Sequence, residues 1–411
     1  MLTQFMTKKS CLIVCPTFFG RPGVFFNWCQ LILGVWLGFI AVSAHCAPQR
    51  LAWDASSGTG PNDGNGDWFG TNVWWSTSGG TNYTWTGTGD EEFVSFGAGT
   101  PGNYFITNNA SIVQPFGIAF TNAGTYTIVT DGTDAGQLQT IVAGGGTSTA
   151  TNAFYVATNV TAIINVPWRL VATADFGLGS NSVLTFGQGT FNNVGQITFK
   201  GSGPAASTIN ATNGTWGGTG NPSGTTTADG VTFNVTGAAV VNFGTRFDIA
   251  RSANAAAGYP IANAIVNVGG PGATAQLNVN TAGQTAQGNN TGNHLQISRG
   301  GPGVLNVLPG GLLSTLSYIN SGSIVSGNMR ITPDSSSQGA VNISGGTVNV
   351  GIGASGTPGI SNPGLTAITL FDANVAGFHS ESWEIDCTCA KPNNIYLRIL
   401  IAFMVLGLSK A

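Results

Sequence analysis

Short runs of alternating apolar and polar residues recur along most of the chain. In Tyr126–Val129 and in Val183–Phe186, apolar and hydroxyl-bearing residues take turns, and Gly, Asn and Asp interrupt the chain between such runs. Alternation with a period of two places successive side chains on opposite faces of a β-strand, and the interrupting residues are those that turns require. Helical periodicity is absent there. The pattern predicts an all-β fold from about residue 98 onward.

An apolar–Asn–apolar triplet is the clearest internal repeat. In a strand its outer residues face one side and its Asn the other, so one side builds a core while amides line the opposite face. Steps between successive Asn residues are 8, 25, 11, 28, 36 and 7, which predicts strands within one coil mixed with steps of one or more coils. Stacked coils would let the amides form ladders. The triplets are centred on Asn234, Asn242, Asn267, Asn278, Asn306, Asn342 and Asn349.

Repeats of this kind, none of which can bury its apolar face alone, are typical of a stacked solenoid. We therefore expect a parallel β-helix, with a β-sandwich that has Gly-rich turns as the alternative. Gly-Gly pairs would supply positive φ angles at the corners of the coils. These pairs stand at 269–270, 300–301, 310–311 and 345–346.

The N-terminal segment has the parts of a secretory signal. A basic region precedes an apolar run from Leu31 to Val42, and small residues follow at Ser43 and Ala44. We expect export with cleavage after Ala44, with an uncleaved anchor or lipid attachment at Cys46 as alternatives. No cysteine lies between Cys46 and Cys387, so the body has neither a disulfide framework nor a cysteine metal site.

Composition changes again near the C-terminus, where acids, Lys and Arg appear and Gly almost disappears. This tail ends in a short hydrophobic run, and a membrane anchor, a docking cap and a frame-shifted end all remain open. The predicted segments are a signal peptide or N-terminal anchor at 1–47, an aromatic, turn-rich N-terminal cap at 48–99, a β-solenoid body at 100–378 and an atypical tail at 379–411.

Charge is scarce throughout the chain. Charged residues make up 7% of it, against about 25% in ordinary globular domains, and the formal net charge is -3. A nucleic-acid-binding protein needs a basic footprint, which this composition lacks. The 42% hydrophobic content argues against a disordered chain.

The N-terminal segment offers two candidate binding features. Trp68, Trp74, Trp75 and Trp85 could form a platform on which sugars stack, although a cap over the end of the solenoid is the favoured interpretation. Asp63, Asn65 and Asp67 place side-chain oxygens at alternate positions, as calcium loops do. Because Trp68 stands where such a loop requires Gly, an ordinary turn is favoured over a calcium site. No other cofactor is expected.

Catalytic residues are not apparent in the body. Asp131 and Asp134 flank a Gly-Thr turn, and His294 has no motif partner. Arg246 and Arg251 bracket Asp248, which predicts a local ion pair at a coil edge. A glycosidase needs two carboxyl groups about 5 to 10 Å apart. The acids between Pro101 and Leu370 are Asp131, Asp134, Asp175, Asp229, Asp248 and Asp334.

Two regions carry a resemblance to a known family. One opens with Leu51–Asp54 and runs to Phe93–Gly97, and the other comprises Gly303–Val307 and Val341–Val350. The chain resembles the bacterial autotransporter-associated β-strand repeat proteins, which are surface or secreted proteins with pertactin-like bodies. The resemblance implies a right-handed β-helix and a cell-surface, outer-membrane-associated or extracellular location. It includes neither the C-terminal β-barrel of a complete autotransporter nor any catalytic residue.

The expected function is that of a noncatalytic, exported structural or adhesive β-solenoid. Its expected partners are cell-envelope components or extracellular polysaccharide, with no nucleic acid, and with membrane contact only through a terminal hydrophobic segment. The alternative is a β-helix that binds or cleaves polysaccharide, as a lyase or a glycosidase does. The ligand and the oligomeric state stay open.

Overall fold

The computed structural model describes residues from Arg50 to Leu370, with gaps. The chain divides into two compact units, Met1–Ala47 and Pro48–Ala411, and every described residue belongs to the second. The predicted signal segment, Cys46, the 379–411 tail, Asp131, Asp134 and Asp334 lie outside the described residues. The gaps are 86–92, 109–111, 114, 131–136, 141–151, 171–172, 190–195, 218–224, 252–262, 280, 282–292, 299, 321–322, 326–327, 332–338 and 354–367.

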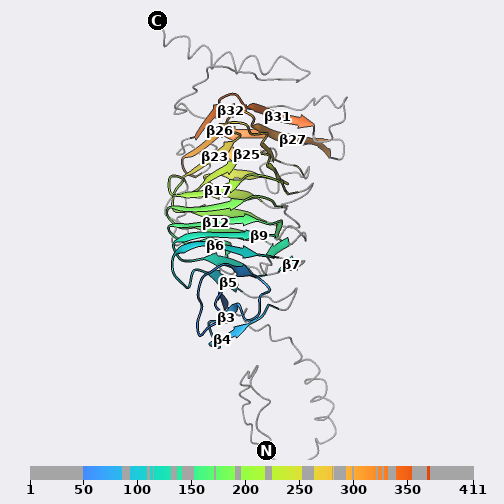
Figure 1. The fold of residues 1–411 in the computed structure, drawn as a ribbon. Coiled ribbons are helices and arrows are strands. Elements are labelled where there is room, and N and C mark those ends of the chain that lie inside the picture. The colour runs from blue at the N-terminus through green and yellow to red at the C-terminus, as the bar shows by residue number, and fades with distance from the viewer. Residues whose placement is uncertain are drawn as a thin grey trace, which may run out of the picture. The chain divides into compact units, whose positions relative to one another are not determined.

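All regular structure in these residues is β, and most of it lies in long parallel sheets (Figure 1). Sheet A contains, in spatial order, β32 (Ile368–Leu370), β29 (Asn328–Ile331), β25 (Asn293–Ile297), β22 (Phe247–Ile249), β19 (Thr226–Asp229), β16 (Ile197–Gly201), β14 (Ala174–Leu178), β11 (Asn152–Val156), β8 (Gly117–Phe120), β5 (Phe93–Phe96), β1 (Arg50–Trp53), β3 (Trp74–Ser76) and β4 (Thr81–Tyr83).

Sheet B is entirely parallel. It contains, in spatial order, β2 (Gly66–Asp67), β6 (Gly102–Thr107), β9 (Gly124–Val129), β12 (Val160–Asn165), β15 (Ser182–Phe186), β17 (Ser207–Ala211), β20 (Thr232–Val235), β23 (Ala264–Val268), β26 (Gly303–Val307) and β30 (Gly339–Ile343).

Two shorter sheets form a third side. Sheet C contains β13 (Trp168–Leu170), β10 (Gln137–Thr140) and β7 (Ile112–Val113). Sheet D contains β18 (Thr215–Trp216), β21 (Val240–Phe243), β24 (Gln276–Val279), β27 (Leu312–Asn320), β28 (Ser323–Val325) and β31 (Thr347–Gly353), and within it β27 and β28 pair as an antiparallel hairpin.

Successive coils stack by parallel pairing. The chain passes from sheet A to sheet B and then to sheet D in β19, β20 and β21, and repeats this path in β22, β23 and β24. Each strand of the first set pairs in parallel with its counterpart in the second. The all-β prediction is confirmed, and the long parallel sheets are those of a β-helix or solenoid, whereas a sandwich is built from antiparallel sheets.

Coil length varies widely, which explains the irregular spacing of the triplets. Thr226 and its partner Phe247 are 21 residues apart, whereas Phe247 and its partner Leu295 are 48 apart. Asn234 and Asn242 lie in sheets B and D of one coil, while Asn306 and Asn342 are register partners one coil apart. The predicted mixture of steps within a coil and between coils is confirmed.

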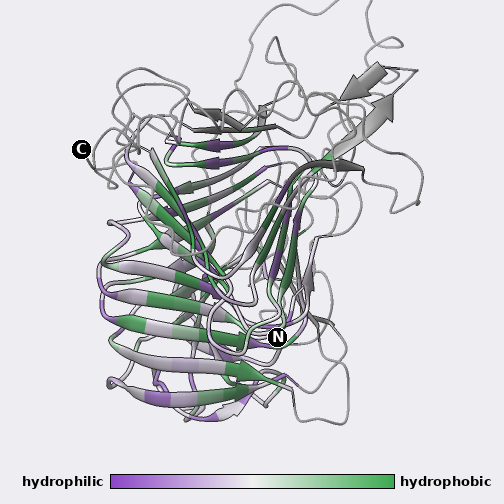
Figure 2. Ribbon diagram, turned by 90° about the horizontal axis from the view of Figure 1, so that it is seen from above, coloured by the Kyte–Doolittle hydropathy of each residue, from purple (hydrophilic) through white to green (hydrophobic). Residues whose placement is uncertain are grey.

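The interior is apolar and aromatic, because the inward-facing residues that alternate along the strands are mostly apolar. Hydrophobic and hydrophilic positions lie close together along the same strands (Figure 2). In β26, Leu305 and Val307 are fully buried, while Val304 and Asn306, which alternate with them, are half-buried. Like residues stack from coil to coil, as in the register partners Phe96 and Phe120, whose ring centroids are 5.3 Å apart. This burial supplies the apolar free energy that holds the coils together.

Corner glycines occupy conformations that favour glycine. Gly269, in the first of the predicted pairs, has a φ of 102°, and Gly310 has a φ of 71°. A Cβ atom on Gly310 would lie 1.9 Å from the carbonyl oxygen of Ala273 in the preceding coil. These corners therefore need glycine both for its backbone freedom and for close contact between coils.

Candidate functional site

A row of polar side chains crosses the outer face of sheet A. Asp175, Thr198, Thr227, Asp248 and Gln296 are successive register partners in β14, β16, β19, β22 and β25. The residues next to them, such as Phe176 and Ile249, point into the core, so this row points outward. Nevertheless Asp248 has 0% of its surface exposed, and the other four are each below 9%. The row is polar but closed to solvent.

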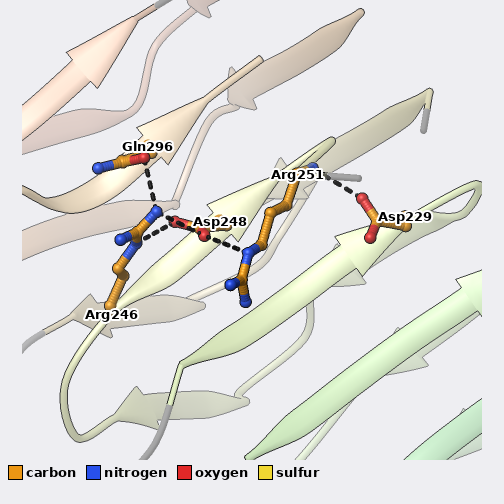
Figure 3. Close-up of polar contacts among 5 residues, drawn as sticks. All are labelled: Asp229, Arg246, Asp248, Arg251 and Gln296. Atoms are coloured by element: carbon orange, nitrogen blue, oxygen red, sulfur yellow. Dashed lines mark hydrogen bonds and ion pairs between the residues drawn. The ribbon is translucent and has the colours of Figure 1, made fainter. Parts of the chain in front are cut away.

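Asp248 is the centre of an ion-pair cluster (Figure 3). Arg246 donates hydrogen bonds to both of its carboxylate oxygens, one of them from Nη2 to Oδ2 at 2.8 Å. Arg251 Nε lies 3.5 Å from Asp248 Oδ2. Two guanidinium groups therefore neutralise one buried carboxylate, which offsets the desolvation that its burial imposes.

Other coils contribute to the same cluster. Arg246 Nη2 also donates to Gln296 Oε1 at 2.7 Å, and the backbone N–H of Arg251 donates to Asp229 Oδ1 at 2.7 Å. The cluster thus joins β19, β22 and β25 (Figure 3). A further pair on this face, Lys200 and Asp175, has an N–O distance of 2.7 Å.

The sequence identified only part of this cluster. The predicted pairing of Asp248 with Arg246 and Arg251 is confirmed, but its placement at a coil edge is wrong, because Asp248 is the central residue of β22. Asp229 and Gln296 were missed, since they come from neighbouring coils and the unequal coil lengths hide the register. The charged pair Lys200 and Asp175 was missed for the same reason.

The geometry of the cluster suits a contact that holds neighbouring coils together better than it suits a general acid or base. A general acid or base must reach the proton that it transfers. Asp248 has no exposed surface, and both of its oxygens accept hydrogen bonds from Arg246. The most exposed group of the cluster is cationic, since the Arg251 side chain is 38% exposed.

The structure places the predicted sugar platform largely in the core. Trp68 and Trp74 have 0% of their surface exposed and Trp85 has 3%, whereas Trp75 is half-buried. Trp68 and Trp74 have ring centroids 4.7 Å apart and pack against Phe96. A ring enclosed in this way offers no face to a sugar, so in this structure only Trp75 retains one.

The three candidate calcium ligands bind separate parts of the fold. Asp63 accepts hydrogen bonds from the backbone of Gly97 and Gly99 and from the Tyr126 hydroxyl, with distances between 2.9 and 3.0 Å. Asn65 Oδ1 accepts from the Phe105 N–H, and Asp67 Oδ1 from the Phe69 N–H.

The Asp63 contact also affects Tyr126. Burial, followed by the negative charge of Asp63, raises the pKa of Tyr126 far above its usual value. The tyrosine therefore stays protonated and donates its O–H to Asp63. The contacts of Asp63 and Asn65 join segments that are at least 34 residues apart, whereas Asp67 accepts from a backbone N–H only two residues further on. A calcium ion at this position stays a prediction. Within the described ranges no three His, Cys, Asp or Glu side chains gather as metal ligands.

An amide ladder runs along the outer face of sheet B. Asn234 Nδ2 donates to Asn210 Oδ1 at 2.8 Å, Asn267 to Asn234 at 2.7 Å, Asn306 to Asn267 at 2.7 Å and Asn342 to Asn306 at 2.8 Å. The predicted ladder of stacked amides is confirmed. A shorter one in sheet D joins Asn278 to Asn242 at 2.9 Å.

Comparisons of the chain with protein-family models, with curated proteins and with solved structures gave no match. Among the described residues, no helix is long and apolar enough to span a membrane. The backbone of His294 lies in β25, but its side chain is outside the described part of the chain. The assignment of function therefore depends on the two outer faces described above.

Proposed function

We propose that this chain is a noncatalytic β-solenoid with a structural or adhesive role at the cell surface or outside the cell. The observation that carries the proposal is the contrast between sheets A and B. Two acids of sheet A, Asp248 and Asp175, are buried and ion-paired. Sheet B instead presents a regular ladder of neutral amides. Such a stack suits a stiff, repetitive surface.

The finer features of the proposal follow from the sequence. They are a right-handed β-helix, an N-terminal cap built around the buried tryptophans, export by the N-terminal segment, and resemblance to the autotransporter-associated repeat proteins. The position of Trp53, Trp68 and Trp74 at the β1 end of the stack supports a cap, because the last strands of sheet A there pair antiparallel. Antiparallel pairing at that end would limit addition of further parallel coils.

A polysaccharide-cleaving enzyme is the second candidate. The observation in its favour is that sheet A brings Asp229 of one coil beside Asp248 and two arginines of the next coil. Thr227, beside Asp248 in the row, is 2% exposed, and its hydroxyl has no hydrogen-bond partner among the described residues. An enzyme would have to open this cluster to admit substrate, since Asp248 is fully buried.

Product release decides between the two candidates. Purified full-length protein is incubated with neutral and acidic polysaccharides, and new reducing ends and unsaturated uronates are measured alongside protein retention on the same polymers. The scaffold proposal expects retention on a polysaccharide or on cell envelopes and no product above the protein-free control. Product that disappears in Asp248→Asn, and in the more exposed Arg251→Lys as a second variant, would establish the enzyme instead.

The cellular location of the protein is tested in a separate experiment. Antibodies against the solenoid should label intact producing cells or their culture medium. Labelling that requires permeabilised cells would contradict an exported role.

A further inference from the structure

The outer face of sheet B is free of charge over most of its length. None of the nine strands from β6 to β30 contains an acidic or a basic residue. The strands of sheet A, by contrast, contain Asp175, Lys200, Asp229 and Asp248. Adjacent strands lie about 4.8 Å apart, so the neutral face extends for about 40 Å along the stack. A ligand on this face would therefore meet no charged side chain from these strands.

Two parallel rows give this face its chemistry. The amide ladder from Asn210 to Asn342 forms one row. Inside the ladder, Asn234, Asn267 and Asn306 each use one N–H and one acceptor position, which leaves a second N–H and further acceptor capacity on each of them. The neighbouring row is rich in methyl groups and is half-buried. We call it the methyl row, and it contains Thr161, Val183, Thr208, Thr232, Ile265 and Val304.

An exposed aromatic ring stands in line with the amide ladder. Phe105 is 54% exposed and is the one exposed large hydrophobic side chain among the described residues. Its register partner is Thr127, and the same row continues through Ile163 and Thr185 to Asn210. The backbone N–H of Phe105 donates to Asn65 Oδ1 at 2.8 Å, which fixes the start of the row.

We propose that this face of sheet B binds a neutral linear polysaccharide, laid along the stack of coils, with one sugar ring packed on Phe105. Sugar rings have apolar C–H faces and hydroxyl edges. The methyl row and Phe105 match the faces, and the amide ladder supplies donors and acceptors for the hydroxyl groups. Regular repetition of both rows from coil to coil matches a polymer with a regular repeat.

The absence of charged residues in these strands favours a neutral polysaccharide over an acidic one as the ligand. An acidic polymer would be expected where cations are exposed, as at Arg251 and Lys200 on sheet A, whose side chains are 38% and 24% exposed. Sheet B offers such a polymer no counter-charge. The inference rests on the proposed adhesive function and gives that function a ligand class and a surface.

Affinity electrophoresis of the full-length protein tests the site. The gels contain linear glucomannan or mixed-linkage β-glucan as neutral probes, and polygalacturonate as the acidic probe. Wild-type protein should be retarded by a neutral probe and not by polygalacturonate, and affinity should rise with oligosaccharide length up to chains of about 40 Å. Phe105→Ala should weaken binding about tenfold, which corresponds to about 1.4 kcal/mol.

Matched variants distinguish binding at the outer face of sheet B from binding elsewhere on the molecule. Thr161→Lys places a long cation in the methyl row and should weaken binding at least as much as Phe105→Ala. Thr158→Lys adds the same charge at the exposed corner between β11 and β12, and Tyr155→Ala removes a half-buried ring from sheet A. Both controls should bind like the wild type, and thermal melting should show all four variants folded.

Each contrary result has a distinct meaning. Failure of the wild type to bind either neutral probe, or equal binding by Phe105→Ala and Thr161→Lys, would overturn the inference while leaving an adhesive role on another surface. Light scattering that shows a dimer abolished by these two variants would assign the face to a second copy of the chain and would also overturn it. Release of products from the neutral probe would refute the noncatalytic function itself.

Discussion

Val307 provides the most direct test of which residues face the core. It lies in β26 between Val268 and Ile343 of the adjoining coils and has 0% of its surface exposed. Val307→Asp should destabilise the protein strongly, because an unpaired carboxylate would replace an apolar side chain. Loss of the valine's burial costs about 1.5 to 3 kcal/mol, and an uncompensated buried charge adds about 3 to 5 kcal/mol.

The expected total is about 5 kcal/mol or more, which is comparable with the whole stability of many domains. Val304 is the matched control, because the same change in the same strand falls on the half-buried outer face. Val304→Asp should change the free energy of unfolding by about 1 kcal/mol or less.

Urea unfolding followed by circular dichroism measures both variants. Because coils of a solenoid interact mainly with their neighbours, hydrogen exchange should show the Val307→Asp effect concentrated in β23, β26 and β30. Similar unfolding curves for Val307→Asp and Val304→Asp would refute the assignment of inward and outward positions, and with it the register of the coils.

Three further substitutions test contacts between coils. Arg246→Ala should lower the unfolding free energy by about 3 to 5 kcal/mol in urea titrations, because Asp248 would stay buried without its bidentate partner, and a change below 1 kcal/mol would contradict the cluster. Asn267→Ala should cost about 1 to 2 kcal/mol in the same titration, since it removes two ladder hydrogen bonds, and a stabilised variant would argue against the ladder. Gly310→Ala should lower the melting temperature more than Gly272→Ala, because both glycines have a φ of 71° but only Gly310 lies against the preceding coil, and equal losses would contradict that contact.

The repeating local pattern made much of the body readable from sequence. In the triplet Phe233–Val235, for example, the alternation that buries Phe233 and Val235 and turns the half-buried Asn234 outward is visible in three consecutive residues. The amide ladder follows once such triplets are stacked in register. Both features depend on neighbours in sequence or on repetition of the same motif, so local chemistry is sufficient to predict them.

The cluster on sheet A shows where this reasoning stops. Arg246 and Asp248 are two residues apart, and their pairing was predicted. Gln296 is 50 residues from Arg246, and nothing in the intervening sequence indicates that one coil spans that distance. The exposed ring of Phe105 was missed for a related reason, since a strand of mixed residues does not reveal which face stays open.

The burial of individual tryptophan rings could not be read from composition. A group of tryptophans suits either a sugar platform or an apolar cluster, and the two cannot be separated by residue type. Packing of Trp53 against Trp74, with ring centroids 5.2 Å apart, and of Trp74 against Phe96 places these rings inside the coils. Such contacts depend on chain segments that are brought together only by the fold.

The proposed noncatalytic role rests most directly on the burial of Asp175 and Asp248 on sheet A. Carbodiimide labelling of carboxylates in the native full-length protein, read by mass spectrometry, tests it directly. Asp175 and Asp248, at 5% and 0% exposure, should stay unlabelled in the folded protein and react only after unfolding in urea. Rapid labelling of Asp248 in the native state would show a carboxylate accessible to substrate and would contradict the account.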